Sequence, residues 1–238
     1  MAEFRRFFVD SVSAEFLVTG EEFQHAVNVL RIKVGENVIV CDNTGDEYFC
    51  VVKKINKKDF VLEVLSKSKS EVEAMTDVTL ICGYLKGDKT ELVIQKAVEL
   101  GIKKIVVFSS RYSSAYMNDN KLTRLNRVSV ESAKQCGRAI APKVVYAENF
   151  STALNFGNDC QNKLFACEFA DKNAVDFAKL SGSTAIVVGS EGGFSQEESE
   201  LAFNSGYETV YLGKRILRAD TASIVLCGII MHSLNELE

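Results

Sequence analysis

The stretch AIVVGSEGGFSQEESELAFNSG, residues 185–206, contains a strand, a glycine turn and a helix in succession. Ala185 to Val188 are small or β-branched apolar residues, as is typical of a buried strand. Ser195 and Glu198 have the spacing of a helix capping box, and Gly206 stands where a helix commonly ends. The stretch therefore predicts one βα unit of a layered α/β fold.

The glycine cluster inside this unit, Gly189 to Gly193, has the topology of a ligand-binding turn between a strand and a helix. Glycines permit positive φ and close backbone approach, so the amides and carbonyls here could hold a small polar molecule. The spacing is not G-x-G-x-x-G, which argues against a dinucleotide site. From this segment alone, a plain tight turn is an equally good interpretation.

A second strand, irregular loop and helix follow at LGKRILRADTA, residues 212–222. In a purely structural interpretation, Asp220 or Thr221 caps the helix, and Ile216 and Leu217 fill the core. In a functional one, apolar walls beside backbone donors suit a flat heterocycle, and Arg218 stabilises a developing anion. The segment alone does not decide between them.

From residue 72 onward, strands and helices alternate, which predicts a mostly parallel sheet covered on both faces. Strands are expected at 78–84, 105–109, 144–147, 163–167, 185–189 and 209–212, and helices at 90–100, 121–139, 196–204 and 221–234. Asp88 and Glu91 have the spacing of another capping box. The last helix is apolar on nearly every side, so its own domain or a second subunit must cover it.

The first part of the chain predicts a small β-barrel instead. Short β-rich runs are expected at 4–10, 36–41, 47–55 and 60–65, with one helix at 21–30. Residues 66–71 are polar without periodicity, as expected of a linker. We therefore predict two domains, at residues 1–71 and 72–238.

Composition excludes several classes of protein. The chain has 238 residues, 47 % hydrophobic and 25 % charged, with one proline, so collagen-like and largely disordered proteins are excluded. The longest apolar run, residues 224–231, is too short to span a bilayer, and no secretory signal is readable, so we expect a cytoplasmic protein without a membrane span. Seven cysteines without a C-x-x-C pair, and two histidines, predict reduced thiols and no metal site.

The net charge of −4 hides a basic segment at residues 103–143, where nine Lys or Arg stand against two acidic residues. In the helix expected there, Arg124, Arg127, Glu131, Lys134 and Arg138 share one face by their spacing. A solvated charged face is the ordinary interpretation, but the predominance of one sign favours RNA phosphates. Four or five neutralised phosphates would give a log–log salt slope of roughly −3 for a single strand.

The segment GYLKGDKT, residues 83–90, resembles a phosphate-binding loop without matching it. Three residues separate its glycines where the P-loop has four, and Asp88 stands where a glycine belongs. A carboxylate at that place repels phosphate, so nucleotide hydrolysis is disfavoured.

Taken together, these segments resemble the 16S ribosomal RNA uridine N3-methyltransferases, a family of the knotted SPOUT superfamily. The match runs along the whole chain, through RRFFV at 5–9, His25, VLR at 29–31, GE at 35–36, Lys86, Glu91, QKAVELG at 95–101, Arg111, Ser113, Gln135, Arg138 and Pro142. Its most specific parts are G-x-EGGFS at 189–195 and LG-x-RILR-x-x-TA at 212–222. Ser190 stands where the family usually has Pro, and Asp220 where it usually has Glu.

The resemblance implies an α/β fold made of a PUA-like N-terminal barrel for RNA and a C-terminal trefoil-knotted, mostly parallel sheet. It implies S-adenosyl-L-methionine as methyl donor, a homodimer, and N3 of a uridine in 16S rRNA of the assembled small ribosomal subunit as acceptor. Two alternatives remain: a SPOUT ribose 2′-O-methyltransferase on rRNA or tRNA, and a non-catalytic RNA-binding assembly protein that kept the fold.

The expected site residues fall into three groups. Catalytic roles are expected of Arg218, Arg138 and Glu191, although Glu191 is equally well a structural group that binds backbone. Cofactor contacts are expected from Gly189, Glu191, Gly192, Gly193, Leu212, Gly213, Ile216 and Leu217. RNA contacts are expected from Arg5, Arg6, His25, Arg31, Arg111, Arg124, Arg127 and Arg138.

Overall fold

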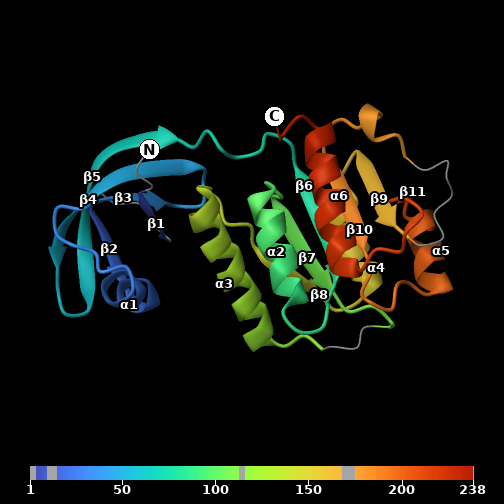
Figure 1. Ribbon diagram of the computed structural model, residues 1–238, viewed down its shortest axis with the longest axis horizontal. Coiled ribbons are helices and arrows are strands. Elements are labelled where there is room, and N and C mark those ends of the chain that lie inside the picture. Colours follow the sequence, from blue (N-terminus) through green and yellow to red (C-terminus); the bar gives the residue numbers. More distant parts are fainter. Residues whose placement is uncertain (1–3, 10–14, 113–115, 168–174, 238) are drawn as a thin grey trace. The chain divides into compact units, whose positions relative to one another are not determined.

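Residues 4–9, 15–112, 116–167 and 175–237 are described by a computed structural model of the chain (Figure 1). Contacts divide the chain into two compact units. The first consists of Met1–Glu73 with Ala133–Ala141, and the second of Ala74–Ser132 with Pro142–Glu238. The chain therefore passes between the units three times, after residues 73, 132 and 141.

The first unit is built on a five-stranded sheet in the order β1-β3-β4-β5-β2. Its elements are β1 (Arg5–Phe8), β2 (Glu15–Thr19), α1 (Gly20–Asn28), β3 (Asn37–Cys41), β4 (Asp46–Ile55) and β5 (Asp59–Lys69). β1 pairs with β3 in parallel, and the other pairs are antiparallel. The alternating inward side chains of these strands form one core, which includes the fully buried rings of Phe7, Phe16 and Phe60.

The linker expected at residues 66–71 is wrong over most of its length, because β5 continues to Lys69. Ser66 to Lys69 pair with β4 in antiparallel register. Lys67 and Lys69 both form ion pairs with Asp46 on that strand, at 2.6 Å each. Hydrogen bonds to a neighbouring strand and these cross-strand charges hold a segment that has little apolar periodicity of its own.

The second unit contains a fully parallel six-stranded sheet in the order β11-β9-β10-β6-β7-β8. The strands are β6 (Val78–Gly83), β7 (Lys104–Phe108), β8 (Val144–Ala147), β9 (Asn162–Ala166), β10 (Thr184–Val188) and β11 (Glu208–Val210). The helices are α2 (Lys89–Glu99), α3 (Asp119–Cys136), α4 (Phe150–Leu154), α5 (Gln196–Asn204) and α6 (Ala219–Ser233), with short 3₁₀ helices η1 (Asn155–Gly157) and η2 (Phe177–Lys179). The predicted α/β class, with a small β-rich N-terminal unit, is confirmed.

Helices cover both faces of this sheet. α4 and α5 pack on the face that carries Phe108, Phe165 and Val187. α2 and α6 pack against each other, and Figure 1 shows them together in front of the sheet. Strand order alone does not define how the chain threads, so the trefoil knot stays a prediction.

The register of the sheet brings three strand ends to one edge. Val188 at the end of β10 lies opposite Ala166 at the end of β9, and Ala166 lies opposite Val210 at the end of β11. Because all three strands are parallel, the loops that follow them leave the sheet side by side. This edge is where an open α/β sheet offers a ligand site.

The predicted helix ends are partly confirmed. Ser195 and Glu198 form the expected capping box on α5. The similar box expected at Asp88 is wrong, because its side chain makes no capping hydrogen bond and forms an ion pair with Arg124 at 3.5 Å instead. Strand β2 and helix α4 were absent from the sequence prediction, since both are short.

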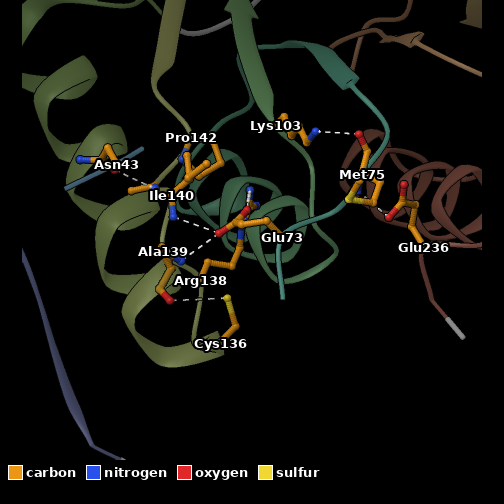
Figure 2. A network of polar contacts seen from close by, with 12 residues as sticks. Asn43, Glu73, Met75, Lys103, Cys136, Arg138, Ala139, Ile140, Pro142 and Glu236 are labelled. Carbon is orange, nitrogen blue, oxygen red and sulfur yellow. Dashed lines mark hydrogen bonds and ion pairs between the residues drawn. The ribbon is translucent and has the colours of Figure 1, made fainter. Parts of the chain in front are cut away.

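The half-buried carboxylate of Glu73 joins two segments of the first unit (Figure 2). Its Oε2 accepts from Nε of Arg138 at 3.0 Å and from Nη2 at 2.8 Å. Its Oε1 accepts from the backbone amides of Ala139 at 2.8 Å and Ile140 at 2.9 Å. The side chains of Glu73 and Arg138 are only 13 % and 3 % exposed, so a charge-assisted pair, with both of these guanidinium nitrogens on one oxygen, joins residue 73 to the segment after α3.

Replacing Glu73 by Ala is expected to lower the free energy of unfolding by about 3–5 kcal/mol, because Arg138 stays buried after losing this carboxylate. Urea unfolding followed by circular dichroism measures the change. Asp77→Ala is the matched control, since Asp77 also pairs with a cation but is 77 % exposed, and it should cost less than about 1 kcal/mol. Equal losses in the two variants would show that the Glu73 pair contributes no more than a surface pair.

Candidate active site

A pocket of about 720 Å³ lies at the edge of the sheet where β9, β10 and β11 end. Loops from these three strands and the starts of α2 and α6 line it: Lys89, Ala166, Cys167, Val188, Gly189, Ser190, Glu191, Gly193, Phe194, Val210, Tyr211, Leu212, Gly213, Lys214, Arg215, Ile216, Leu217, Arg218, Ala219 and Ala222. The two glycine-bearing segments singled out in the sequence therefore meet at one cavity. Of the expected cofactor contacts, Gly192 alone does not line it.

The turn after β10 depends on glycine because backbone and rings surround it closely. A Cβ on Gly189 would lie 2.9 Å from the ring of Phe194, and one on Gly192 would lie 2.5 Å from Cβ of Tyr112. Gly193 has φ of +67°, and its amide donates to the carbonyl of Ser190 at 3.0 Å. The segment is thus a tight, backbone-lined turn. Gly192 packs against Tyr112 and does not line the pocket.

The neighbouring strands hold this turn in place. A Cβ on Gly83, the last residue of β6, would lie 2.8 Å from the carbonyl carbon of Gly189, so β6 passes directly against the turn. Ser190 is 4 % exposed, and its hydroxyl is 2.9 Å from that of Ser110, which follows β7. The resembled family usually has proline at position 190, which would restrict the backbone through its ring. In this chain, the buried hydroxyl pair of Ser190 and Ser110 holds the turn instead.

Glu191 anchors the turn to the start of α2. Its Oε1 accepts from the backbone amide of Lys86 at 3.1 Å and from Nζ of Lys89 at 3.3 Å. Burial opposes ionisation, but hydrogen bonds from its own amide and that of Lys86, together with the Lys89 ammonium, lower the pKa of Glu191 below its ordinary value. A carboxylate held ionised in this way is a weak proton acceptor, which favours the structural role over that of a base.

The loop from Leu212 to Arg218 forms the other side of the pocket. Gly213 has φ of +94°, a conformation that favours glycine. In the described part of the chain, the amides of Gly213 to Leu217 donate no hydrogen bond, so they face solvent or a ligand. The side chain of Ile216 is 89 % exposed, so the expectation that it fills the core is wrong.

Arg218 stands at the N-cap position of α6 and also lines the pocket. The cap expected from Asp220 or Thr221 is wrong, because α6 begins earlier, at Ala219, and makes no side-chain capping bond. Arg218 is exposed and forms no ion pair with any described residue. Its guanidinium is therefore available to an anion at the pocket.

Most of the arginines expected to bind RNA are engaged by carboxylates of this chain. Arg5 pairs with Glu36 at 2.6 Å, Arg6 with Glu47 at 2.8 Å, Arg111 with Glu197 at 3.1 Å and Arg124 with Glu91 at 2.8 Å. Arg127 is exposed on α3, and His25 is half-buried in α1.

Arg138 lies beyond the end of α3, buried against Glu73, and does not line the pocket. Its burial favours a structural role over the catalytic and RNA-binding roles expected of it. Lys134, from the same predicted face, also pairs with a carboxylate, that of Glu22. The basic face predicted for this helix is therefore largely neutralised within the chain.

Comparison with known proteins matches both parts of the chain to RNA methyltransferases. Residues 72–231 match the family model described as RNA methyltransferase domain, and residues 18–65 match the one described as RNA methyltransferase PUA domain. The chain belongs to the RNA methyltransferase family. The resemblance drawn from its motifs is thereby confirmed.

Relatives of this methyltransferase span nearly its whole length. Ribosomal RNA small subunit methyltransferase E of Mesomycoplasma hyopneumoniae is 32 % identical over 226 residues, which cover 93 % of this chain and 96 % of the relative. The Bacillus subtilis protein of the same name is 30 % identical over 229 residues, covering 91 % and 90 %. The crystal structure of such an enzyme from Neisseria gonorrhoeae, bound to S-adenosyl methionine, has a TM-score of 0.86 and 26 % identity, covering 96 % of this chain and 97 % of that one.

Some lining residues of this methyltransferase were not expected. Ala166 ends β9 and Cys167 follows it, and Tyr211 follows β11, so each marks a strand end at the pocket edge. The rule that ligands bind at the carboxyl ends of parallel strands could have identified them, had the strand order been known. Lys89, in the segment that resembles a phosphate-binding loop, lies beside Glu191 and lines the pocket.

Neither a metal centre nor a membrane helix is found in the described residues. They contain no group of three or more His, Cys, Asp or Glu side chains placed to hold a metal ion. In the same part of the chain, no helix has the length and apolarity needed to cross a bilayer.

Replacing Glu191 by Gln tests the anchoring role through pH. Because the folded-state pKa lies below the ordinary value of 4.5, the carboxylate stabilises the fold above pH 4.5, and this contribution is lost as the pH falls through the folded pKa. The stability difference between wild type and variant should therefore be constant near neutral pH and shrink on acidification below pH 4.5. Urea unfolding across pH 3 to 8 measures it, and a difference that grows toward acid would contradict the anchoring role.

Proposed function

We propose that this protein transfers the methyl group of S-adenosylmethionine to N3 of a specific uridine in 16S ribosomal RNA. One observation carries the proposal: the turn at 189–193 and the loop at 212–218 line the same pocket at the edge of the parallel sheet. The relatives named ribosomal RNA small subunit methyltransferase E, and the methyl donor in the Neisseria structure, support it.

The pocket fits the methyl donor in size and in chemistry. Its volume of about 720 Å³ lies within the range of small-molecule sites. The amides of the 213–217 loop offer hydrogen bonds, the backbone of Gly189 and Gly193 lines the pocket, and Leu212 and Leu217 offer apolar walls for a flat ring. When bound, S-adenosylmethionine supplies an electrophilic methyl group on a sulfonium centre.

The chain contributes in two ways: it orients the two reactants, and it stabilises the charge that develops during transfer. Holding two reactants in line can remove about 7–11 kcal/mol of barrier at most. Loss of the N3 proton to solvent water leaves negative charge on the flanking carbonyl oxygens of uracil, and the guanidinium of Arg218 stabilises this charge. Its exposure at the pocket supports this role. Glu191 keeps the turn in place through its contacts with Lys86 and Lys89, and its lowered pKa favours this role over that of a base.

The first unit is proposed to bind RNA through the turn between α1 and β3. Arg31 is exposed there with φ of +54°, and no ion pair with a described residue engages its side chain. Val29 and Val34, 66 % and 61 % exposed, flank it with apolar surface. A cation without a competing carboxylate, beside apolar side chains, suits a phosphate and an adjoining base.

We also propose that two copies of the chain associate, and that the assembled small ribosomal subunit is the substrate. The exposed apolar residues Leu92 on α2 and Val225 on α6, 41 % and 39 % exposed, support a contact between copies. These helices pack against each other, so the two residues contribute to a surface that a second copy would cover. A cytoplasmic location follows from this substrate.

Nucleoside mass spectrometry of 16S rRNA tests the reaction. Cells that lack the protein should lose 3-methyluridine from this RNA, and the purified protein with S-adenosylmethionine should restore it to the small subunits of those cells. Appearance of a ribose 2′-O-methyl nucleoside instead would identify the related SPOUT activity. Absence of any methylation, with donor binding lost in calorimetry, would leave an RNA-binding assembly protein.

Replacing Arg218 by Ala is expected to lower kcat by about 10²–10³, as the removal of one preorganised anion stabiliser does. The Kd for S-adenosylmethionine, measured by calorimetry, should change much less, because the charge develops only during transfer. Lys179→Ala, which removes an 84 % exposed cation, is the control and should keep full activity. Unchanged kcat in the Arg218 variant would remove this residue from the reaction.

A further inference from the structure

The lining of the pocket carries an excess of cations. It contains the cations Lys89, Lys214, Arg215 and Arg218 but a single carboxylate, that of Glu191. Lys89 is engaged by that carboxylate at 3.3 Å. The other three side chains are exposed and form no ion pair or hydrogen bond with any residue the structure describes.

This loop differs from the basic segment that the sequence singled out. Arg111 and Arg124 each face a carboxylate of the chain, at 3.1 Å and 2.8 Å, and Lys134 pairs with Glu22. A phosphate that binds at such a residue must compete with the carboxylate already there. Lys214 and Arg215 face no such competition, so each gains the full benefit of neutralising a phosphate and releasing a counterion.

An apolar side chain stands in the middle of these charges. Ile216 is 89 % exposed, more than any other large hydrophobic residue in the described chain. It directly follows Lys214 and Arg215 and lines the pocket. Exposed apolar residues are common on surfaces, but this one lines the pocket that is proposed to hold the methyl donor.

We propose that Lys214, Arg215 and Ile216 form an RNA clamp and wedge at the pocket. Lys214 and Arg215 bind the phosphates next to the target nucleotide, and Ile216 inserts into the space that the extruded uridine leaves in the stack. Branched apolar wedges of this kind are used by proteins that unstack bases while cations hold the backbone. The inference rests on the proposed function. It assigns RNA binding at the pocket to residues other than Arg218.

The charges are tested with the double variant Lys214→Gln/Arg215→Gln, assayed for methylation of small ribosomal subunits over a series of salt concentrations. Loss of two phosphate contacts should raise KM for RNA and make the log–log salt slope less steep by about 1.4. The Kd for S-adenosylmethionine and kcat should stay within about twofold, because the affected step is RNA binding.

The matched control is Lys103→Gln/Lys179→Gln, which removes two cations that pair with Asp77 and Asp176. Its salt slope should equal that of the wild type. Equal slopes for both double variants would overturn the clamp. A wild-type protein that binds the donor but methylates no RNA would overturn the proposed function instead, so the two failures are distinguishable.

The wedge is tested with Ile216→Ala and the conservative variant Ile216→Leu. The readouts are kcat/KM for the small subunit, the Kd for S-adenosylmethionine, and the fluorescence of 2-aminopurine placed next to the target uridine in an RNA fragment. We expect Ile216→Ala to lose about tenfold in kcat/KM and the fluorescence rise that reports unstacking, with an unchanged Kd for the donor, and Ile216→Leu to restore both. A raised Kd for the donor in Ile216→Ala, with normal unstacking, would make Ile216 a cofactor wall and overturn the wedge.

Discussion

The parallel register of the six-stranded sheet is the constraint on which the functional part of the structure depends. Val188, Ala166 and Val210 lie opposite one another at the ends of adjacent strands, so the segments that follow them must share one edge. The close approach of β6 at Gly83 then leaves the turn after β10 little room to shift. A site made mainly of backbone groups has few side chains to correct an error, so its precision comes from the sheet.

Sequence patterns predicted the elements that carry strong local signals. The capping box at Ser195 and Glu198 and the apolar strand before it defined one βα unit, and both appear in the structure. Short elements without such signals, such as β2 and α4, were missed, and Lys67 and Lys69 read as linker because pairing with β4 is not local information. The division into domains 1–71 and 72–238 stays a prediction.

The glycines of the candidate site were predicted, as were Glu191 and Arg218 at the pocket, but the other available cations, Lys214 and Arg215, were not. Which backbone turns approach a ligand follows from glycine and strand position, both of which are visible along the chain. Which cations are available depends on partners far away in sequence, since Arg124 meets Glu91 and Arg138 meets Glu73 only in the fold. The cations of α3, whose spacing resembles a nucleic-acid surface, are thus largely paired with carboxylates of the chain. The loop cations Lys214 and Arg215 have no such partner among the described residues.

The carboxylate of Glu73 binds both the guanidinium and the amides of a segment that lies some 65 residues further along the chain. Because Ala133–Ala141 belongs to the first unit while the residues on both sides of it belong to the second, no single cut yields two complete halves. A gene fragment that begins at residue 74 would still encode Ala133–Ala141, nine residues whose packing partners in the first unit would be missing. The two units are therefore expected to be inherited and exchanged together, as one piece, in recombination between relatives.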